Sequence, residues 1–422
     1  MYTCKKLINT PGMEKMKLVS GEGGLDRTIS WVHVSEIQEV VEWVEGGELL
    51  FITGVTIKDD KDALLKLVKS LNNKGLSGLV INVGPYIKKT PQEVIKFADS
   101  LDFPIFELPF EVKLIEITHI ICREIFSYKL QEESINSFLD EIMFGDKIID
   151  EEILKKGIGY GYNPDKNYYS LLVSLDDFRE FDTVNNIDKE ESVIKLKNNV
   201  IKIIDKVMEK NNRKYIYLSK DDEIYLMIAI NRNITTFNFI NNIAKQIKDE
   251  LNIINLSVTI GVGEKACNLN QFKKAALDAK SSMEISKKLF GKNSIGDFKK
   301  LGVYKLLFSI NNNDIMISLY NDVLGKLNNS DKNSYKELMT SLEVYIDENR
   351  NIGNAADRLF IHRNTMKYRI NKIEQILKCD LKDDKTIFNI ILCIKIGKFL
   401  GYNWKIDYYT QKMIKYLFVM DI

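Results

Sequence analysis

The sequence predicts a multidomain protein that is α/β followed by all-α, and three observations lead to this prediction. The chain has 422 residues, which is enough for two or three domains that each bury a core of their own. Strand-like and helix-like segments alternate over residues 28–126 and again over 164–300, as they do in α/β layers. After about residue 301 only helical patterns remain, so a helical region is expected at 301–401.

The composition is that of ordinary globular domains. Apolar residues make up 45% of the chain and charged residues 28%, and the formal net charge is +1. The sequence opens with no signal-peptide core and has no run of about 18 uncharged apolar residues, so we expect a cytoplasmic protein that does not enter a membrane. The five cysteines are widely spaced, at positions 4, 122, 267, 379 and 393. This spacing favours neither disulfides nor a zinc site, and we expect no metal and no cofactor.

The first block, residues 1–126, reads as a parallel α/β domain. Strands are expected at 28–35, 48–54, 77–84 and 103–109, and helices at 61–75, 90–102 and 113–126. Four apolar residues recur at helical spacing in the first of these helices: Leu64, Leu67, Val68 and Leu71. Gly75 ends that helix, while Thr90 and Pro91 are the expected N-cap and first residue of the next one. Strands that alternate with helices predict a parallel sheet with right-handed crossovers.

Residues 127–163 read as a helical connector. Five apolar residues form one stripe of this helix: Ile135, Phe138, Leu139, Ile142 and Met143. Such a helix suits either a link between domains or a dimer contact. Three glycines and a proline within 157–167 then break the helix and mark a domain boundary.

The second α/β block covers residues 164–300. Its expected elements are a strand, a helix, a hairpin, a helix, a strand and a helix, at 168–178, 188–210, 214–230, 236–251, 255–263 and 268–289. Gly291 ends the last helix. The helical region of 301–401 follows, and residues 402–422 form a tail to which we assign no role.

A helix-turn-helix motif is expected at about 351–377, after a helix at 334–349. Asn351 caps a short helix at 352–360, and Ile361 and His362 separate it from a second helix at 363–377. Ala355 and Ala356 are small where the two helices must approach closely. Six apolar residues supply the shared core: Leu359, Ile361, Met366, Ile370, Ile373 and Leu377. Many such motifs have glycine where Phe360 stands, so this turn must accept a bulky residue.

The second helix of the motif carries a DNA-binding pattern on its outer side. No acidic residue lies between Arg358 and Glu374. The expected contact residues are His362, Arg363, Asn364, Thr365, Lys367, Tyr368, Arg369, Asn371 and Lys372. Arg pairs with guanine, Asn with adenine and Lys with phosphate, and the first turn of a recognition helix meets the base edges. Taken alone, a basic helix face is usually solvated surface; the alanine pair, the turn length and the core spacing favour DNA. His362 suits phosphate contact and helix capping equally well.

These residues resemble a known family. The stretch "LEVYIDENRNIGNAADRLFIHRNTMKYRINKIEQILKCDL" is similar to the C-terminal helix-turn-helix of PucR-type (purine catabolism regulator, CdaR-like) transcription factors, and "HRNTxxYR" at 362–369 is its most specific part. The segments "GGELLFITG", "GLSGLVINVG" and "DFPIFELPFE" look like the sensor domain of that family, and 164–300 looks like its GGDEF-like domain. The tail extends beyond the family pattern. The resemblance implies a parallel α/β sensor, a GGDEF-like α/β domain and a DNA-binding helical domain.

The central domain departs from active diguanylate cyclases. The resemblance implies a hairpin with two glycines and a strand end with two metal-binding acids. Here the hairpin reads Lys220-Asp221-Asp222-Glu223-Ile224 and the strand end reads Ser174-Leu175-Asp176-Asp177-Phe178. Both glycines are absent and a serine occupies the first metal-ligand position, so we expect no enzyme activity.

An effector site is expected at the carboxyl ends of the strands in the first block, where open parallel sheets bind ligands. The candidate residues there are Thr53, Gly54, Gly84 and Glu107, although all four also suit ordinary turns and caps. The resemblance implies purine-pathway signals for some family members, and nothing in this sequence selects an effector. We therefore expect a ligand-responsive regulator that binds double-stranded DNA as a homodimer or higher oligomer. The alternatives are a catalytically inactive nucleotide or metabolite receptor that signals through protein contacts and, less favoured, an active diguanylate cyclase.

Overall fold

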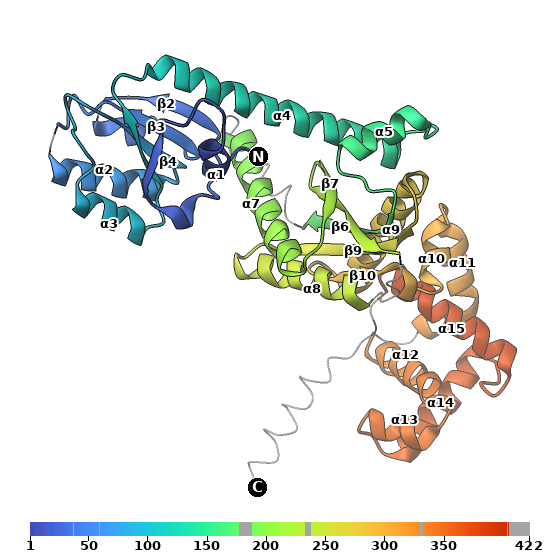
Figure 1. Cartoon of the computed structure of the whole chain (residues 1–422). Helices are drawn as coiled ribbons and strands as arrows, with labels where there is room; N and C mark the ends of the chain where they lie inside the picture. Colours follow the sequence, from blue (N-terminus) through green and yellow to red (C-terminus); the bar gives the residue numbers. More distant parts are fainter. Residues whose placement is uncertain are drawn as a thin grey trace, which may run out of the picture. The chain divides into compact units, whose positions relative to one another are not determined.

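The computed structural model of the chain describes residues 1–36, 38–58, 60–176, 188–232, 238–329, 332–402 and 404. The chain forms two compact units, Met1–Ser137 and Phe138–Ile422 (Figure 1). No helix within the described ranges combines the length and the apolar character needed to cross a membrane. Apart from Tyr402 and Trp404, the tail at 402–422 lies outside the described residues, as do Asp177 and Phe178.

The N-terminal unit contains a five-stranded sheet in the order β1-β5-β4-β3-β2. Its strands are β1 (Lys17–Ser20), β2 (Trp31–Val34), β3 (Glu48–Ile52), β4 (Gly78–Val83) and β5 (Ile105–Pro109). Strands β2 to β5 run parallel, which confirms the predicted parallel layer. The antiparallel edge strand β1, paired with β5, was not predicted, because a strand of four residues carries too short a pattern to stand out.

Helices cover both faces of this sheet. They are α1 (Cys4–Ile8), α2 (Lys61–Lys74), α3 (Gln92–Ser100) and the first part of α4 (Leu114–Phe144), with the 3-10 turns η1 (Glu22–Gly24) and η2 (Gln38–Glu42). Alternate strand residues point to opposite faces: Leu50 and Ile52 join the core under α2 and α3, whereas Leu49 and Phe51 join the core under α1 and α4. Burial on both faces explains why these strands read as continuous apolar runs.

The helix ends of this unit follow the expected chemistry with one correction. Asp60 caps α2 by accepting hydrogen bonds from the backbone N–H groups of residues 62 and 63, and Gly75 ends the helix with φ +80°. The prediction that Thr90 caps α3 is wrong: Pro91 is the N-cap residue, and it makes no side-chain cap bond. The backbone N–H of Thr90 instead donates to Glu107 Oε1 at 2.8 Å, so this threonine is drawn toward β5.

Helix α4 is continuous over Leu114–Phe144. The helix predicted at 113–126 and the start of the predicted connector are therefore one element. The predicted boundary at residue 126 follows from the sequence pattern, because the spacing of the apolar residues changes there. No glycine or proline interrupts the helix, so its hydrogen-bond ladder continues through that position.

The second unit contains a sheet in the order β10-β9-β6-β8-β7. Its strands are β6 (Lys166–Leu175), β7 (Tyr215–Lys220), β8 (Glu223–Asn231), β9 (Val258–Ala266) and β10 (Ile295–Asp297). β6 pairs antiparallel with both β8 and β9, and β7 and β8 form the predicted hairpin. The helices are α5 (Glu151–Gly159), α7 (Asp188–Lys210), α8 (Asn238–Ile253) and α9 (Phe272–Phe290), with the turn η3 (Leu269–Gln271).

Glycine lets α9 lie directly on strand β9. A Cβ atom on Gly261 would approach Ala279 O to 2.0 Å, and one on Gly263 would approach Ala275 O to 2.3 Å. Any larger residue at these positions would push the helix off the sheet. The glycines of the predicted strand "VTIGVG" are thus packing residues.

The helical region forms a single core with α9. Its elements are η4 (Phe298–Lys300), α10 (Tyr304–Ser309), α11 (Asn313–Leu324), η5 (Gly325–Asn329), α12 (Lys332–Asp347), α13 (Ile352–Arg358), α14 (Arg363–Leu377) and α15 (Asp384–Phe399). Ile285 of α9 belongs to the same buried cluster as the helix-turn-helix residues. Lys288 of α9 lies 3.9 Å from the ring centroid of Phe399 on α15.

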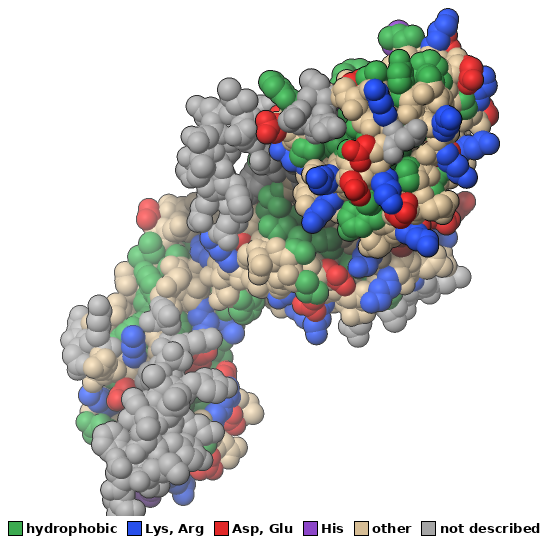
Figure 2. Space-filling view, turned by 90° about the vertical axis from the view of Figure 1, so that its left-hand side faces the viewer, with side chains coloured by type: hydrophobic (Ala, Val, Ile, Leu, Met, Phe, Trp, Pro, Cys, Tyr) green, Lys and Arg blue, Asp and Glu red, His purple; other side chains and the backbone are tan. Residues whose placement is uncertain are grey.

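On the face drawn in Figure 2, Lys and Arg side chains are interspersed with Asp and Glu.

Candidate nucleic-acid interface

The helix-turn-helix forms as the sequence predicts. Asn351 Oδ1 caps α13 by accepting hydrogen bonds from the backbone N–H groups of Gly353, at 2.9 Å, and Asn354, at 3.2 Å. Ala355 and Ala356 are buried where α13 meets α14. The predicted core residues of α14 are buried too: Met366, Ile370, Ile373 and Leu377. One side of α14 is therefore committed to packing and the other is left for solvent or a ligand.

The turn between the two helices contains a strained aromatic residue. The N–H of Phe360 donates to Asp357 O at 3.1 Å and the N–H of Ile361 donates to Ala356 O at 3.0 Å, which is the Schellman pattern of a helix end. This pattern needs a left-handed residue, and Phe360 takes that conformation with φ +52°. A side chain in this region costs about 1 kcal/mol or more. The Phe360 side chain recovers little of that cost by packing, because it is 77% exposed.

The start of α14 is exposed and capped by its own histidine. His362 Nδ1 accepts a hydrogen bond from the backbone N–H of Asn364 at 3.2 Å, so in this structure the histidine caps the helix. The exposed members of the predicted contact set are His362, Arg363, Asn364, Thr365, Lys367, Tyr368 and Asn371, and Lys372 is half-buried. Within the described residues, no salt bridge engages Arg363, Lys367 or Lys372. These cations therefore remain available to an external anion.

Arg369 differs from the other predicted contact residues. Its guanidinium lies 3.0 Å from Glu337 Oε2 and 3.3 Å from Ser341 Oγ, both on α12, and the side chain is only 16% exposed. Arg369 thus ties α14 to α12. Helical spacing places Arg369 beside the residues on the outer side of α14. Its acidic partner could not be recognised from the sequence, because Glu337 lies 32 residues away on another helix.

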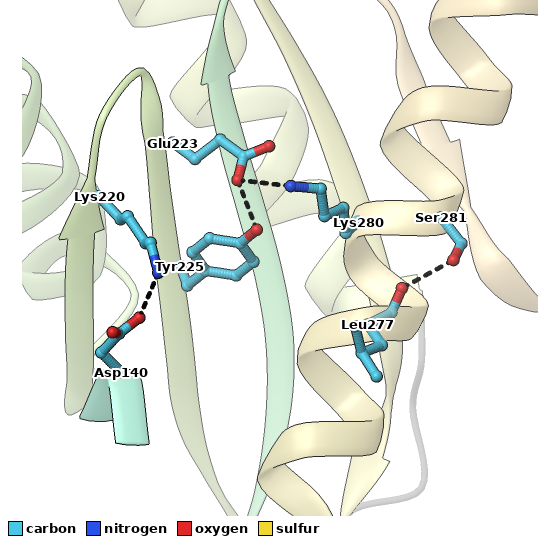
Figure 3. Close-up of polar contacts among 7 residues, drawn as sticks. All are labelled: Asp140, Lys220, Glu223, Tyr225, Leu277, Lys280 and Ser281. Carbon is cyan, nitrogen blue, oxygen red and sulfur yellow. Dashed lines mark hydrogen bonds and ion pairs between the residues drawn. The ribbon is translucent and has the colours of Figure 1, made fainter. Parts of the chain in front are cut away.

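Figure 3 shows the hairpin of the central domain, where active cyclases have their glycines. Asp221 and Asp222 form the turn, with Asp221 at φ +49°. The Glu223 carboxylate accepts a hydrogen bond from Tyr225 OH at 2.6 Å and pairs with Lys280 Nζ at 3.1 Å. It is 16% exposed, so its charge is neutralised within the domain.

The other side of the hairpin is held by the end of α4. Lys220 Nζ lies 2.7 Å from Asp140 Oδ1 and 5.1 Å from the ring centroid of Phe144 (Figure 3 draws the ion pair). The Phe144 ring meets Tyr225 edge-on at 5.1 Å. The hairpin tip is therefore held by an ion pair to α9 and by an ion pair and aromatic contacts to α4.

Asp176, at the end of strand β6, is surrounded by hydrogen-bond donors from its own domain. The side chain of Asp176 is 0% exposed. Its carboxylate receives four donors: Thr259 Oγ1 at 2.7 Å, Ser257 Oγ at 2.8 Å, Asn293 N at 2.9 Å and Lys287 Nζ at 3.1 Å. Burial acts to raise the pKa of Asp176, but these donors outweigh it and hold the pKa below its ordinary value. Sequence reasoning missed these donors, which lie more than 80 residues away along the chain.

Ser174, at the first metal-ligand position, is buried between Glu223 and Thr259 in the sheet register. Among the residues that the structure describes, no three His, Cys, Asp or Glu side chains come together in a metal-binding group.

Three of the four candidate effector residues, Thr53, Gly54 and Gly84, follow the ends of β3 and β4 at one edge of the sheet, as expected for parallel strands. Glu107 instead is the middle residue of β5, so the prediction that it lies at the strand end is wrong. Each of the four has a contact inside the domain. The backbone N–H groups of Thr53 and Gly54 donate to the carboxylate of Glu36, at 2.5 and 3.0 Å. A Cβ on Gly84 would approach Phe110 Cβ to 2.4 Å, so glycine is needed there for packing. Glu107 accepts the Thr90 N–H described above. Glu36 was not predicted; its only sequence signal is a carboxylate two residues after the end of strand β2.

Comparison with known proteins places all three domains. The purine catabolism regulatory protein-like family matches residues 6–125, the GGDEF-like domain matches 145–285 and the PucR C-terminal helix-turn-helix domain matches 338–396. The matches follow the order of the α/β domain, the central domain and the helical region.

Curated relatives from Bacillus subtilis (strain 168) share part of the chain. The purine catabolism regulatory protein is 29% identical over 155 residues, which are 36% of this chain and 29% of that protein. The proline-responsive transcriptional activator PutR is 30% identical over 142 residues, 33% of this chain and 34% of its own. The DNA-binding transcriptional activator AdeR is 30% identical over 154 residues, 36% of each chain. The matches span about a third of the length of these relatives. With its N-terminal PucR domain, central GGDEF-like domain and C-terminal PucR helix-turn-helix domain, the chain belongs to the PucR family.

Proposed function

We propose that this protein is a cytoplasmic transcription regulator that binds double-stranded DNA through α14 and responds to a small-molecule effector bound by its N-terminal domain. The observation that carries the proposal is the exposed start of α14, where Arg363, Asn364 and Lys367 face solvent behind the His362 cap while the other side of the helix is buried. The names of the relatives, two of which are transcriptional activators, support it.

The residues of α14 divide by their chemistry. Arg363 and Asn364, in the first turn, suit the edges of guanine and adenine. Lys367 and Lys372 suit phosphates, and the helix N-terminus adds a favourable partial charge. Arg369 is better assigned to holding α14 on α12, because its guanidinium already has two partners there.

The test begins with DNA fragments enriched from a random library by the full-length protein, followed by fluorescence titration of the best site. Arg363→Ala should weaken binding to that site by about 1–3 kcal/mol and relax its sequence preference. Lys367→Ala should weaken selected and unrelated DNA alike and reduce the salt dependence. Lys385→Ala, an exposed cation on α15, is the matched control and should have little effect. Equal affinities of wild type and Arg363→Ala would refute the role of α14.

The central domain serves, in this proposal, as a structural and dimerising module without catalysis. The hairpin lacks both glycines, and the carboxylates of Glu223 and Asp176 are engaged by Lys280 and Lys287. Incubation of the purified protein with GTP and Mg²⁺ should yield no cyclic dinucleotide. Detection of that product would favour the cyclase alternative.

A homodimer is the expected assembly, because one recognition helix contacts too little DNA for tight, specific binding. Helix α4 offers a surface for it. Ile115, Phe126 and Leu130 lie on one side of this helix and are 61%, 50% and 63% exposed. Phe126 also meets Trp31 edge-on at 5.8 Å. The double variant Phe126→Asp, Leu130→Asp should sediment as a monomer, whereas Gln131→Asp, an exposed change about 100° further around the helix than Leu130, should remain a dimer. A monomeric wild type, with and without DNA, would contradict this assembly.

The second candidate function is a metabolite receptor that acts only through protein contacts. The degenerate central domain favours it, since such a domain could bind partners without catalysis. Salt-sensitive, sequence-selective DNA binding in the titration above would exclude this candidate.

A further inference from the structure

Three consecutive backbone N–H groups converge on a single carboxylate at the carboxyl end of β3. Glu36 Oε1 accepts a hydrogen bond from the N–H of Thr53 at 2.5 Å. Its Oε2 accepts one from Gly54 at 3.0 Å and one from Val55 at 3.2 Å. Both carboxylate oxygens are therefore engaged by main-chain donors of residues 53–55, which we call the 53–55 nest.

The nest owes its shape to Gly54. This residue has φ +80°, which turns successive N–H groups to the same side of the chain. Ile87 fixes the opposite side, because a Cβ on Gly54 would come within 2.3 Å of Ile87 Cδ1. Backbone groups held in this way form a concave donor site that suits a carboxylate or a phosphate.

The carboxylate that fills the nest comes from a different element. Glu36 follows strand β2 and reaches donors 17 to 19 residues further along the chain. Glu48 provides a contrast: it accepts hydrogen bonds from the N–H groups of Glu45 and Gly46, only three and two residues before it, and so closes its own loop. Glu36 is half-buried. Its carboxylate occupies the nest as the carboxylate of a bound ligand would, but it is tethered to the domain by the glutamate side chain.

We propose that the 53–55 nest is the anion-binding part of the effector site, and that Glu36 is a built-in competitor which a carboxylate-bearing metabolite displaces. The inference rests on the proposed sensing role of this domain and names the chemical class of its effector. The nest lies at the carboxyl edge of a parallel sheet, where ligands of such sheets bind. Displacement of Glu36 leaves the nearby η2 segment anchored, because Val40 and Val44 are buried in the core beside α2.

The competition has a measurable size. A ligand can bind the nest only in molecules whose Glu36 carboxylate has left it. The apparent Kd of such a ligand equals its intrinsic Kd divided by the fraction of molecules in that state. If Glu36 occupies the nest about nine-tenths of the time, its removal strengthens apparent binding by about tenfold. Because the glutamate side chain is short, it gives the tethered carboxylate a high effective concentration at the nest, so Glu36 is expected to occupy the nest about nine-tenths of the time.

The experiment uses the full-length protein, with sodium acetate as the probe and acetamide as its uncharged counterpart. Melting temperatures are recorded against probe concentration, with sodium chloride holding ionic strength constant. Glu36→Ala should melt below wild type and recover saturably with acetate, at about one-tenth of the half-saturating concentration of wild type. Acetamide should have no such effect. Glu48→Ala, which also loses a carboxylate bound to backbone N–H groups, is the control and should not show this recovery.

Three outcomes would overturn the proposal: an acetate response in Glu36→Ala no stronger than in wild type, equal responses to acetate and acetamide, or equal recovery of Glu48→Ala. If Glu36→Ala does not fold, Glu36→Gln leaves an uncharged occupant in the nest and should still respond to less acetate than wild type. Identical responses of Glu36→Gln and wild type would then overturn it. These melts contain no DNA, so they can fail while the Arg363→Ala titration succeeds, and the reverse also holds.

Discussion

Asp278 on α9 is a buried carboxylate whose charge should destabilise the protein at neutral pH. The residue is 9% exposed, and its Oδ2 atom has no hydrogen-bond partner among the residues that the structure describes. Burial, with a smaller contribution from Glu264, raises the pKa of Asp278 to about 6, and Lys274 and Lys305 act in the opposite direction. Asp278→Asn replaces the carboxylate with an uncharged group of the same shape, so this variant should be the more stable protein above pH 6.

The size of the effect follows from the pKa. A raised folded-state pKa means that the carboxyl group stabilises the folded state most in acid, and that this contribution is lost as the pH rises through about 6. The rise from the ordinary value of 3.8 to about 6 sets a ceiling of about 3 kcal/mol on the benefit of Asp278→Asn at pH 8. Between pH 8 and pH 5 wild type regains about 1.4 kcal/mol by protonation, so the advantage of the variant narrows by that amount.

Scanning calorimetry of wild type and Asp278→Asn at pH 8 and pH 5 measures the stability gain of the variant and its dependence on pH. The unfolding transition of the second unit is analysed separately from that of the first. Asp249→Asn, an exposed change on helix α8 of the same domain, is the control and should alter stability little at either pH. An Asp278→Asn variant that is no more stable than wild type at pH 8 would refute the reasoning. So would an advantage that is the same at both pH values.

Two further predictions concern other parts of the second unit. Phe360→Gly should stabilise the protein by about 1 kcal/mol in thermal denaturation, because it relieves the left-handed strain at φ +52°, whereas Phe360→Ala keeps the Cβ and should gain nothing. Asp176→Asn should cost about 2–4 kcal/mol at pH 7, because it removes the charge that four donors surround. The pKa of Asp176 is lowered in the folded state, so its contribution is present above about pH 4 and lost in stronger acid, and the variant should approach wild type there. Urea midpoints that stay equally far apart at pH 3 and pH 7 would contradict this.

The sequence revealed the helix-turn-helix because its determinants are local. The cap at Asn351, the small pair at Ala355 and Ala356 and the core spacing of α14 all fall within 27 residues, and each acts through neighbours on one or two turns. The parallel strands were equally accessible, since burial on both faces makes them continuous apolar runs.

The features that sequence reasoning missed depend on partners far along the chain. Strand β1 pairs with β5, which lies more than 80 residues away, and its four residues have no distinctive pattern. Arg369 reads as one more cation of the outer stripe until α12 brings Glu337 to it. The partner of Thr53 and Gly54 could not be foreseen either, because Glu36 reaches them only through the left-handed turn at Gly54.

The shared core of α9 and the helical region has a practical consequence for work with fragments. Ile285 packs in the same cluster as Met366 and Ile370, and Trp404 lies in it as well, with its indole N–H donating to Glu343. A fragment cut at residue 301 would leave this cluster open on one side and expose it to aggregation. Swapping only residues 338–396 between relatives to change operator preference would create mismatched packing against α9, so such a chimaera should include that helix.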